Sequence, residues 1–245
     1  MKNAERRWLS MADTFLFSGR KSSAFSTYVA DSDGWNSAAR RIDAINVPGR
    51  NGTLTPINSN SFENVQITYL CYLKNEMRTK LNDLVGWLNS HAGYQRLEDT
   101  FHPEYFRLAR YNGSFEVMSK DKLTAAFNVV FDCMPQKFLK SGEQITTLKT
   151  SGSITNPTNY IAKPIIKIYG TGIVKIGSAA IKIVKPGNAF IEFDCDLLNA
   201  YEGSDNRNSN VELIGEPALL PNTTNGITLG NGITKVEIKP RWYTI

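Results

Sequence analysis

The stretch GYQRLEDTFHPEYFRLARY, residues 93–111, gathers most of the side chains in this sequence that could do chemistry. It contains three arginines, three carboxylates and His102, one of only two histidines in the chain. A histidine near a carboxylate can act as a general base, and Glu104 follows His102 by two residues. The sequence offers no nucleophile to accompany them, so we interpret His102 and Pro103 as a structural turn and expect no enzymatic activity.

Arginines and aromatic residues also alternate in this stretch, as they do in proteins that stack the bases of single-stranded nucleic acid. The residues concerned are Arg96, Arg107 and Arg110 with Tyr94, Tyr105, Phe106 and Tyr111. Glu98, Asp99 and Glu104 lie among them and would repel phosphate. Because arginine and tyrosine are enriched at the energetic centres of protein interfaces, the pattern favours contact with protein over sequence-specific contact with nucleic acid.

A second group of carboxylates occurs in FIEFDCDLL, where Glu192, Asp194 and Asp196 are spaced two apart. On a strand these three side chains share one face. They are weak candidates for a calcium site or a glycosidase pair. We favour the solvent-exposed face of a strand that buries Ile191, Phe193 and Cys195, and we expect no metal and no cofactor.

Composition points to an ordinary globular protein. The 245 residues include 28 basic and 23 acidic side chains, giving a net charge of +5 without any tract of one sign. The three cysteines are far apart inside apolar runs, which indicates buried free thiols. No segment approaches the roughly 18 consecutive apolar residues of a membrane span, and the N-terminus has no signal-peptide core. We expect residues 1–10 to be an extension, with Met11 as the natural start.

The elements that must position these residues form a mixed first part, residues 11–138. Strands are predicted at 14–19, 23–30, 63–73 and 123–135, the last ending at Pro135. Met77, Leu81, Leu84, Val85 and Leu88 share one face of a helix, and Gly93 suits its C-terminal turn. Turn residues Pro48, Gly49 and Gly52 predict a loop or hairpin tip.

A stretch rich in Ser, Thr, Gly and Asn, residues 139–158, has the composition of a linker. The remaining sequence, within a second part assigned to 139–245, repeats short apolar-x-apolar units between turn residues, as in a β-sandwich or jelly roll. The repeated NGIT, at 225–228 and 231–234, predicts two successive turns. The expected fold is therefore mainly β with one main helix.

Three segments together resemble the distal tail (Dit) proteins of long-tailed, non-contractile bacteriophages. They are VPGRNG at 47–52, WLNSHAGYQRLEDTFHPEYFRLAR at 87–110 and IKPRWYTI at 238–245. The resemblance implies a ring-forming N-terminal β-sandwich with one helix, similar to tail-tube proteins, and a galectin-like C-terminal β-sandwich. It also implies a homo-hexamer, single or stacked as a dodecamer, that joins the tail tube protein to the tail-associated tip protein and to receptor-binding or baseplate proteins.

Such a protein would be made in the bacterial cytoplasm and carried at the distal end of the virion tail, where its ring surrounds the path of the DNA. We place the ring interface in the stretch 93–111, with Arg96, Glu98, Asp99, Tyr105, Arg107 and Arg110 as its contact residues. Replacing Arg107 by Glu is then expected to weaken ring assembly without unfolding the domain.

Two other functions remain open at the level of sequence. The first is a carbohydrate-binding module that acts in adsorption to the host surface, although the second part offers few aromatic residues. The second is a tail-associated glycosidase that uses Glu192 with Asp194 or Asp196. Neighbouring positions on one strand do not place carboxylates across a substrate, which disfavours the glycosidase.

Overall fold

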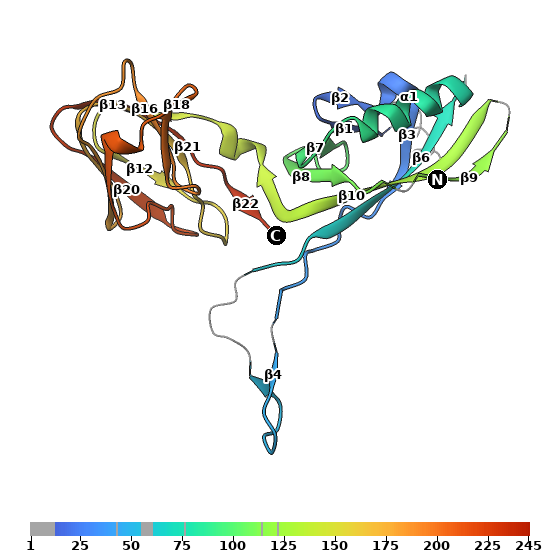
Figure 1. Cartoon of the computed structure of the whole chain (residues 1–245), viewed down its shortest axis with the longest axis horizontal. Helices are drawn as coiled ribbons and strands as arrows, with labels where there is room; N and C mark the ends of the chain where they lie inside the picture. Colours follow the sequence, from blue (N-terminus) through green and yellow to red (C-terminus); the bar gives the residue numbers. More distant parts are fainter. Residues whose placement is uncertain (1–12, 43, 55–60, 76, 114, 122) are drawn as a thin grey trace, which may run out of the picture. The chain divides into compact units, whose positions relative to one another are not determined.

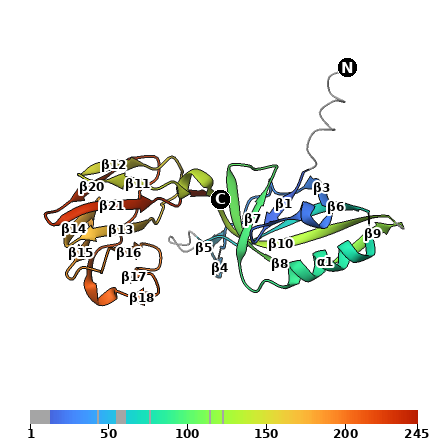
Figure 2. The same cartoon turned by 90° about the horizontal axis from the view of Figure 1, so that it is seen from above.

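The computed structural model describes residues 13–42, 44–54, 61–75, 77–113, 115–121 and 123–245. The predictions of an extension at 1–10 and of a start at Met11 lie outside these residues. The chain divides into two compact units, shown in Figures 1 and 2. Unit 1 extends to Lys137 and includes Ile245, and unit 2 is Phe138–Thr244. The prediction of a mainly β fold with one main helix is confirmed.

Unit 1 is built on a sheet with the strand order β2-β1-β7-β8-β10-β6-β3, in which β9 also pairs with β10. The strands are β1 (Phe15–Phe17), β2 (Arg20–Lys21), β3 (Thr27–Ser32), β6 (Val65–Lys74), β7 (Gln95–Asp99), β8 (Tyr105–Tyr111), β9 (Glu116–Lys120) and β10 (Thr124–Leu139). The β6–β10 pair is antiparallel from Val65↔Cys133 to Lys74↔Thr124. Alternate β6 residues from Val65 to Leu73 are buried because successive side chains of a strand point to opposite faces.

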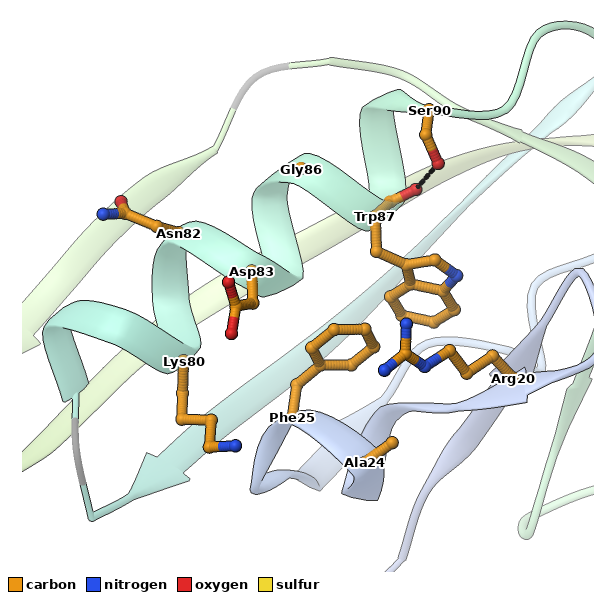
Figure 3. Close-up of a pocket in the computed structure, with 9 residues that line it drawn as sticks. All are labelled: Arg20, Ala24, Phe25, Lys80, Asn82, Asp83, Gly86, Trp87 and Ser90. Carbon is orange, nitrogen blue, oxygen red and sulfur yellow. Dashed lines mark hydrogen bonds between the residues drawn. The ribbon is translucent and has the colours of Figure 1, made fainter.

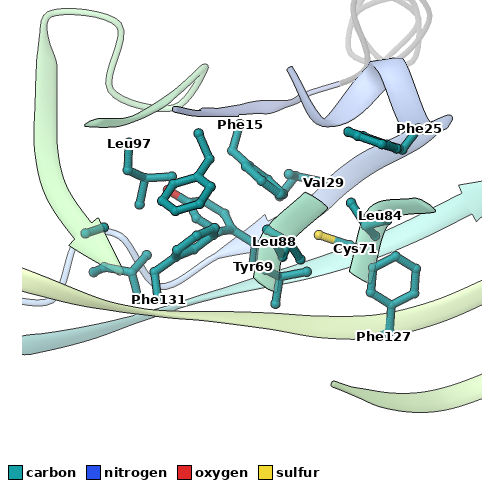
Figure 4. Packing of buried hydrophobic residues seen from close by; sticks show 14 of the residues in the cluster. Phe15, Phe25, Val29, Tyr69, Cys71, Leu84, Leu88, Leu97, Phe127 and Phe131 are labelled. Atoms are coloured by element: carbon teal, nitrogen blue, oxygen red, sulfur yellow. The ribbon is translucent and has the colours of Figure 1, made fainter. Parts of the chain in front are cut away.

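The sheet curls so that its two halves pack face to face (Figure 4). Phe15 on β1 stacks on Tyr69 of β6 with ring centroids 5.3 Å apart, although β7, β8 and β10 separate these strands in the sheet. Phe131 of β10 lies edge-on to Phe15 at 5.5 Å. Backbone pairing of Asp13 with Val29 on the edge strand β3 brings the two ends of the sheet together. Unit 1 thereby encloses its own apolar core.

Helix α1 (Met77–Asn89) covers this core with Leu84, Trp87 and Leu88. The predicted helical face included both leucines but not Trp87, whose ring stacks on Phe25 at 4.8 Å. Phe25 belongs to a 3-10 helix, η2 (Ser22–Phe25), so the predicted strand at 23–30 begins only with β3. No helix in the described part of the chain is long and apolar enough to cross a membrane.

Unit 2 is a sandwich of two antiparallel sheets, with strand orders β11-β21-β13-β16-β17-β18 and β12-β20-β14-β15-β19. The strands are β11 (Thr146–Leu148), β12 (Gly152–Thr155), β13 (Ile165–Gly170), β14 (Gly172–Ile176), β15 (Ala179–Ile183), β16 (Ile191–Asp194), β17 (Asn199–Glu202), β18 (Asp205–Asn206), β19 (Val211–Ile214), β20 (Thr224–Leu229) and β21 (Ile233–Lys239). The short strand β22 (Tyr243–Thr244) belongs to neither of these two sheets. The paired apolar residues of the predicted repeat are buried between the two sheets. Short 3-10 helices occur at Lys140–Glu143 and Asn208–Asn210.

Three details of the sequence interpretation were wrong. The stretch 139–158 is not a linker, because its strands β11 and β12 pair with β21 and β20 as outer strands of the two sheets. The first NGIT lies inside β20, where the buried Asn225 side chain hydrogen-bonds the backbone of Leu220. Strand β10 continues through Pro135 to Leu139.

Candidate functional site

β4 (Ile45–Asn46) and β5 (Thr53–Leu54) form a hairpin in unit 1, and residues 44–54 are called the arm below. Every residue of the arm is exposed to solvent. Its turn carries Gly49 and Gly52 with φ values of 79° and 77°, and the backbone N–H of Arg50 donates to the carbonyl of Val47 at 3.2 Å. Glycine adopts positive φ without steric cost, which explains the VPGRNG sequence. Figure 1 labels the hairpin at β4.

The arm exposes apolar side chains on one face. Ile45 and Leu54 are directly opposed in the ladder and therefore point the same way, and Val47 follows Ile45 by two residues. Ile45 is 55% exposed. An isolated two-stranded hairpin is at best marginally stable in water, and its unpaired edges invite pairing with another chain. The arm therefore has the properties of a segment that another protein surface covers.

The chain segments that lead to the arm are paired with each other. Arg40 bridges Phe62, and Arg41 forms a two-pronged ion pair with Glu63 at 2.6 and 3.0 Å. The backbone N–H of Glu63 donates to the carbonyl of Ala39 at 2.8 Å. Exposed ion pairs contribute little energy, so the register of this pairing is the more important feature. It brings both ends of the arm back to unit 1 at one point.

The root of the arm, Asp33–Asn36, is held by residues of the stretch 93–111. The Arg107 guanidinium donates from one nitrogen to the carbonyls of Gly34 and Asn36, each at 3.4 Å. The Trp35 indole lies edge-on to the His102 ring, with centroids 4.4 Å apart. Gly34 packs so closely that a Cβ there would lie 3.0 Å from His102 Cε1. Two side chains that suggested chemistry in the sequence, Arg107 and His102, thus serve to anchor a projecting segment.

Asp99 organises this anchor, which we call the root cluster: Tyr69, Asp99, His102 and Arg107. Its Oδ2 accepts the Tyr69 hydroxyl at 2.7 Å, and its Oδ1 accepts the His102 backbone N–H at 2.7 Å and faces Nδ1 at 3.1 Å. Burial, and next the charge of Asp99, raise the pKa of Tyr69 well above its ordinary value. Tyr69 therefore stays a neutral hydrogen-bond donor. In the sequence, Tyr69 belongs to the alternating apolar residues of the strand predicted at 63–73, which identified it only as a core residue.

Arg107 is the clearest departure from the predicted ring interface. It is 8% exposed, and burial lowers the pKa of its guanidinium. A side chain enclosed by its own domain cannot present its charge to a neighbouring subunit. The proposed Arg107→Glu change would place an anion beside Asp99 inside unit 1, so it would test folding rather than assembly. The register of β8 decides that the Arg107 side chain is buried, and the sequence does not provide this register.

The other predicted contact residues lie closer to the surface and have partners within unit 1. Arg96 Nε donates to Glu98 at 2.5 Å, and its guanidinium lies 3.8 Å from the centre of the Phe106 ring. Arg110 Nε donates to Asp132 at 2.8 Å. Tyr105 is half-buried, and its backbone N–H donates to the carbonyl of His102 across the predicted turn that contains Pro103. These residues build the β7–β8 hairpin, and Gly93 before it has a φ of 71°.

The unit 2 carboxylates do not form a common site. Asp194, at the end of β16, is buried and accepts two hydrogen bonds from Arg241, at 2.8 and 3.0 Å. Glu192 pairs with Lys167 and accepts the Tyr201 hydroxyl, whereas Asp196 lies in the following turn. Burial raises the pKa of Asp194, but the hydrogen bonds from Arg241 and from backbone N–H groups outweigh it and lower that pKa overall. The expectation of one shared solvent-exposed face was wrong.

Two aromatic rings in unit 2 are covered by lysine side chains. Lys235 Nζ lies 3.9 Å from the centre of the Tyr169 ring, and Lys167 Nζ lies 4.9 Å from that of Phe190. A carbohydrate-binding face needs aromatic rings open to a sugar, and these two rings already have a cation on them. They do not strengthen the carbohydrate-binding alternative.

A shallow hollow of about 480 Å³ lies beside α1 in unit 1 (Figure 3). Its floor is the stacked pair Phe25–Trp87, and the Arg20 guanidinium lies over Phe25 at 4.2 Å. Lys80 and Asp83 stand at its margin. The Ser90 hydroxyl donates to the Trp87 carbonyl at 2.8 Å and thereby closes the last helical turn. The Ser90 hydroxyl also lies 3.1 Å from His91 Nδ1, and both groups contact the Trp87 carbonyl. This arrangement completes the end of the helix.

Comparison with solved structures assigns this arrangement to a known fold. The crystal structure of SPP1 Dit matches 96% of this chain and 100% of its own length, with a TM-score of 0.71 and 13% sequence identity. The chain has the Dit fold. Chains of the phage P2 baseplate in its activated conformation, with Ca and with Sr, match 94% of this chain at TM-scores of 0.55 and 0.53, with 9% identity. These matches cover 98% and 97% of the baseplate chains.

No protein-family model matches the sequence, and no curated protein matches it either. At 13% identity the match to SPP1 Dit shows a shared fold.

Proposed function

We propose that this protein is a structural subunit of the hub at the distal end of a long-tailed, non-contractile phage tail. The observation that supports the proposal is the match of both units, over nearly the whole chain, to SPP1 Dit. That protein is described as a paradigm of the hub adsorption apparatus in phages that infect Gram-positive bacteria. Phage P2 baseplate chains share the same fold, which supports a role in a tail-tip assembly rather than in an enzyme.

In this proposal six copies form a ring, single or stacked in pairs, and residues 11–138 build the ring. Residues 139–245 form an outward β-sandwich that carries receptor-binding or baseplate proteins. The tail tube protein and the tail-associated tip protein occupy opposite faces of the ring, and DNA passes through it. A head-to-tail interface that closes into a ring repeats one contact and leaves no subunit without a neighbour.

The arm is the part of unit 1 best suited to such a contact. Its apolar face and free strand edges are exposed, whereas Arg107 and Asp99 behind it hold its root in place. The candidate interface therefore shifts from the stretch 93–111 itself to the arm that this stretch supports.

Light scattering on a sizing column tests the proposal first. A mass near six or twelve times 27.4 kDa, together with rings in negative-stain electron micrographs, is expected. Val47→Asp on the arm should lower the mass without lowering the unfolding midpoint, since exposed substitutions usually change stability by no more than about 0.5 kcal/mol. Ile214→Asp, at an exposed apolar position of unit 2, is the matched control and should leave the mass unchanged.

A monomer that also fails to co-purify with the tail tube and tip proteins of its own phage would contradict a hub role. If the wild type, Val47→Asp and Ile214→Asp all form rings of the same mass, the hub proposal stands but the arm is not part of the ring interface.

A further inference from the structure

His102 lies where one added proton would change what the root of the arm packs against. Its ring contacts Trp35 and Gly34 on one side and Asp99 on the other. A carboxylate can only accept hydrogen bonds, so the short contact to Asp99 assigns the ring proton to Nδ1 in the neutral tautomer. The proton that makes the ring cationic must therefore bind at Nε2.

Nε2 is buried and has no hydrogen-bond partner among the described residues. As an unprotonated acceptor it is tolerated there, but as an N–H donor it would be an unsatisfied buried group, which is costly. The ring lines a cavity of only about 20 Å³, which leaves it little room to turn within the closed cluster.

Charged and titratable groups face His102 from every element around it. Asp99 and Glu98 come from β7, Arg107 and Tyr105 from β8, Tyr69 from β6 and Lys137 from β10. The carboxylate of Asp33, next to Gly34, instead accepts the Thr68 backbone N–H. The Asp99 carboxylate favours an imidazolium, but Arg107 supplies a cation that already interacts with this carboxylate. When the ring is protonated, the cost of an unsatisfied buried Nε2–H therefore makes the closed cluster unfavourable.

We propose that protonation of His102 opens the root cluster and releases the segment Asp33–Asn36, so that the arm becomes free to reorient in mild acid. Trp35 is 75% exposed, so its contact with the His102 ring is the one that costs least to break. An outward turn of the ring brings Nε2–H to water while Asp99 keeps the hydrogen bond from Tyr69. We call the contacts of His102 with Asp99 and with the segment Asp33–Asn36 the latch. The latch acts on the arm whether or not the chain forms a tail hub.

Hydrogen–deuterium exchange of the full chain tests the latch at about pH 5 and about pH 8, the range in which imidazoles change charge. After correction for the intrinsic pH dependence of exchange, amides of residues 33–42 should lose protection about tenfold in acid, as expected for one unsatisfied buried donor. His102→Asn keeps a donor near Nδ1 but cannot titrate, so it should abolish the change. His91→Asn removes the only other histidine and should behave as the wild type.

Equal acid responses in the wild type and His102→Asn would overturn the proposal. If His102→Asn does not fold, NMR titration of the two imidazoles in the wild type, assigned with His91→Asn, replaces it. The midpoint of the loss of protection must then coincide with the titration of His102, and separate midpoints would equally overturn the latch.

Discussion

Arg107→Met tests whether a buried cation, rather than a surface contact, is what the stretch 93–111 contributes. Methionine has a similar length and can fill much of the space, but it leaves Asp99 without a neighbouring positive charge. It also removes the donor to the carbonyls of Gly34 and Asn36. We expect the variant to fold, to be less stable in unit 1, and to lose protection at the root of the arm.

The size of the effect follows from burial. Removing one partner from a buried charged group costs about 3–5 kcal/mol, because the remaining charge is left uncompensated. The hydrogen bonds of Arg107 are long, at 3.4 Å, which places the expectation near the lower value of about 3 kcal/mol. With a denaturant dependence of about 1–3 kcal/mol per molar urea, the midpoint should fall by about 1–3 M.

Arg110→Met is the matched control on the same strand. The Arg110 side chain is 55% exposed and pairs with Asp132, so its loss should cost about 0–1 kcal/mol. Pulse proteolysis in urea, with fragments identified by mass spectrometry, reports the unfolding of unit 1 separately from that of unit 2. If both variants unfold at the same urea concentration, the root cluster contributes nothing to stability and Arg107 does not hold the arm.

Two further predictions concern unit 2 and the thiols. The folded pKa of Asp194 lies below the unfolded value of about 3.9, so its contribution to stability is fully present above that value and is lost as the pH falls through the folded pKa. Thermal unfolding between about pH 2 and pH 6 should show this acid sensitivity in the wild type and less of it in Arg241→Met, and identical pH profiles would contradict it. Burial raises the pKa of each of three thiols to about 12: Cys71, Cys133 and Cys195. A colorimetric thiol reagent at about pH 8 should find none in the native protein and all three in denaturant, and rapid reaction before unfolding would refute their burial.

Local patterns in the sequence were sufficient for most elements. The alternation from Val65 to Leu73 became β6, and the 3.6-residue spacing from Met77 to Leu88 became α1. Where these predictions were wrong, pairing with distant strands decided the outcome. Polar residues at 146–155 resemble a linker until β21 and β20 provide ladder partners, and Asn225-Gly226 resembles a turn until Leu220 satisfies the amide. The partner strands of β11 and β12 lie far away in the sequence. The Leu220 backbone is close to Asn225 in the sequence, but its hydrogen bonds leave no local periodicity either.

By itself the sequence determined which segments are apolar and where the chain turns, since side-chain period and glycine conformation are local properties. It also identified 93–111 as unusual. The tertiary structure alone decided what the residues of that stretch do, because burial depends on which strands become neighbours. The curled sheet encloses Arg107 and brings Asp99 to Tyr69 across 30 residues of sequence, and it leaves the arm uncovered. Side chains with the composition of an active site thus became the support of a projecting hairpin.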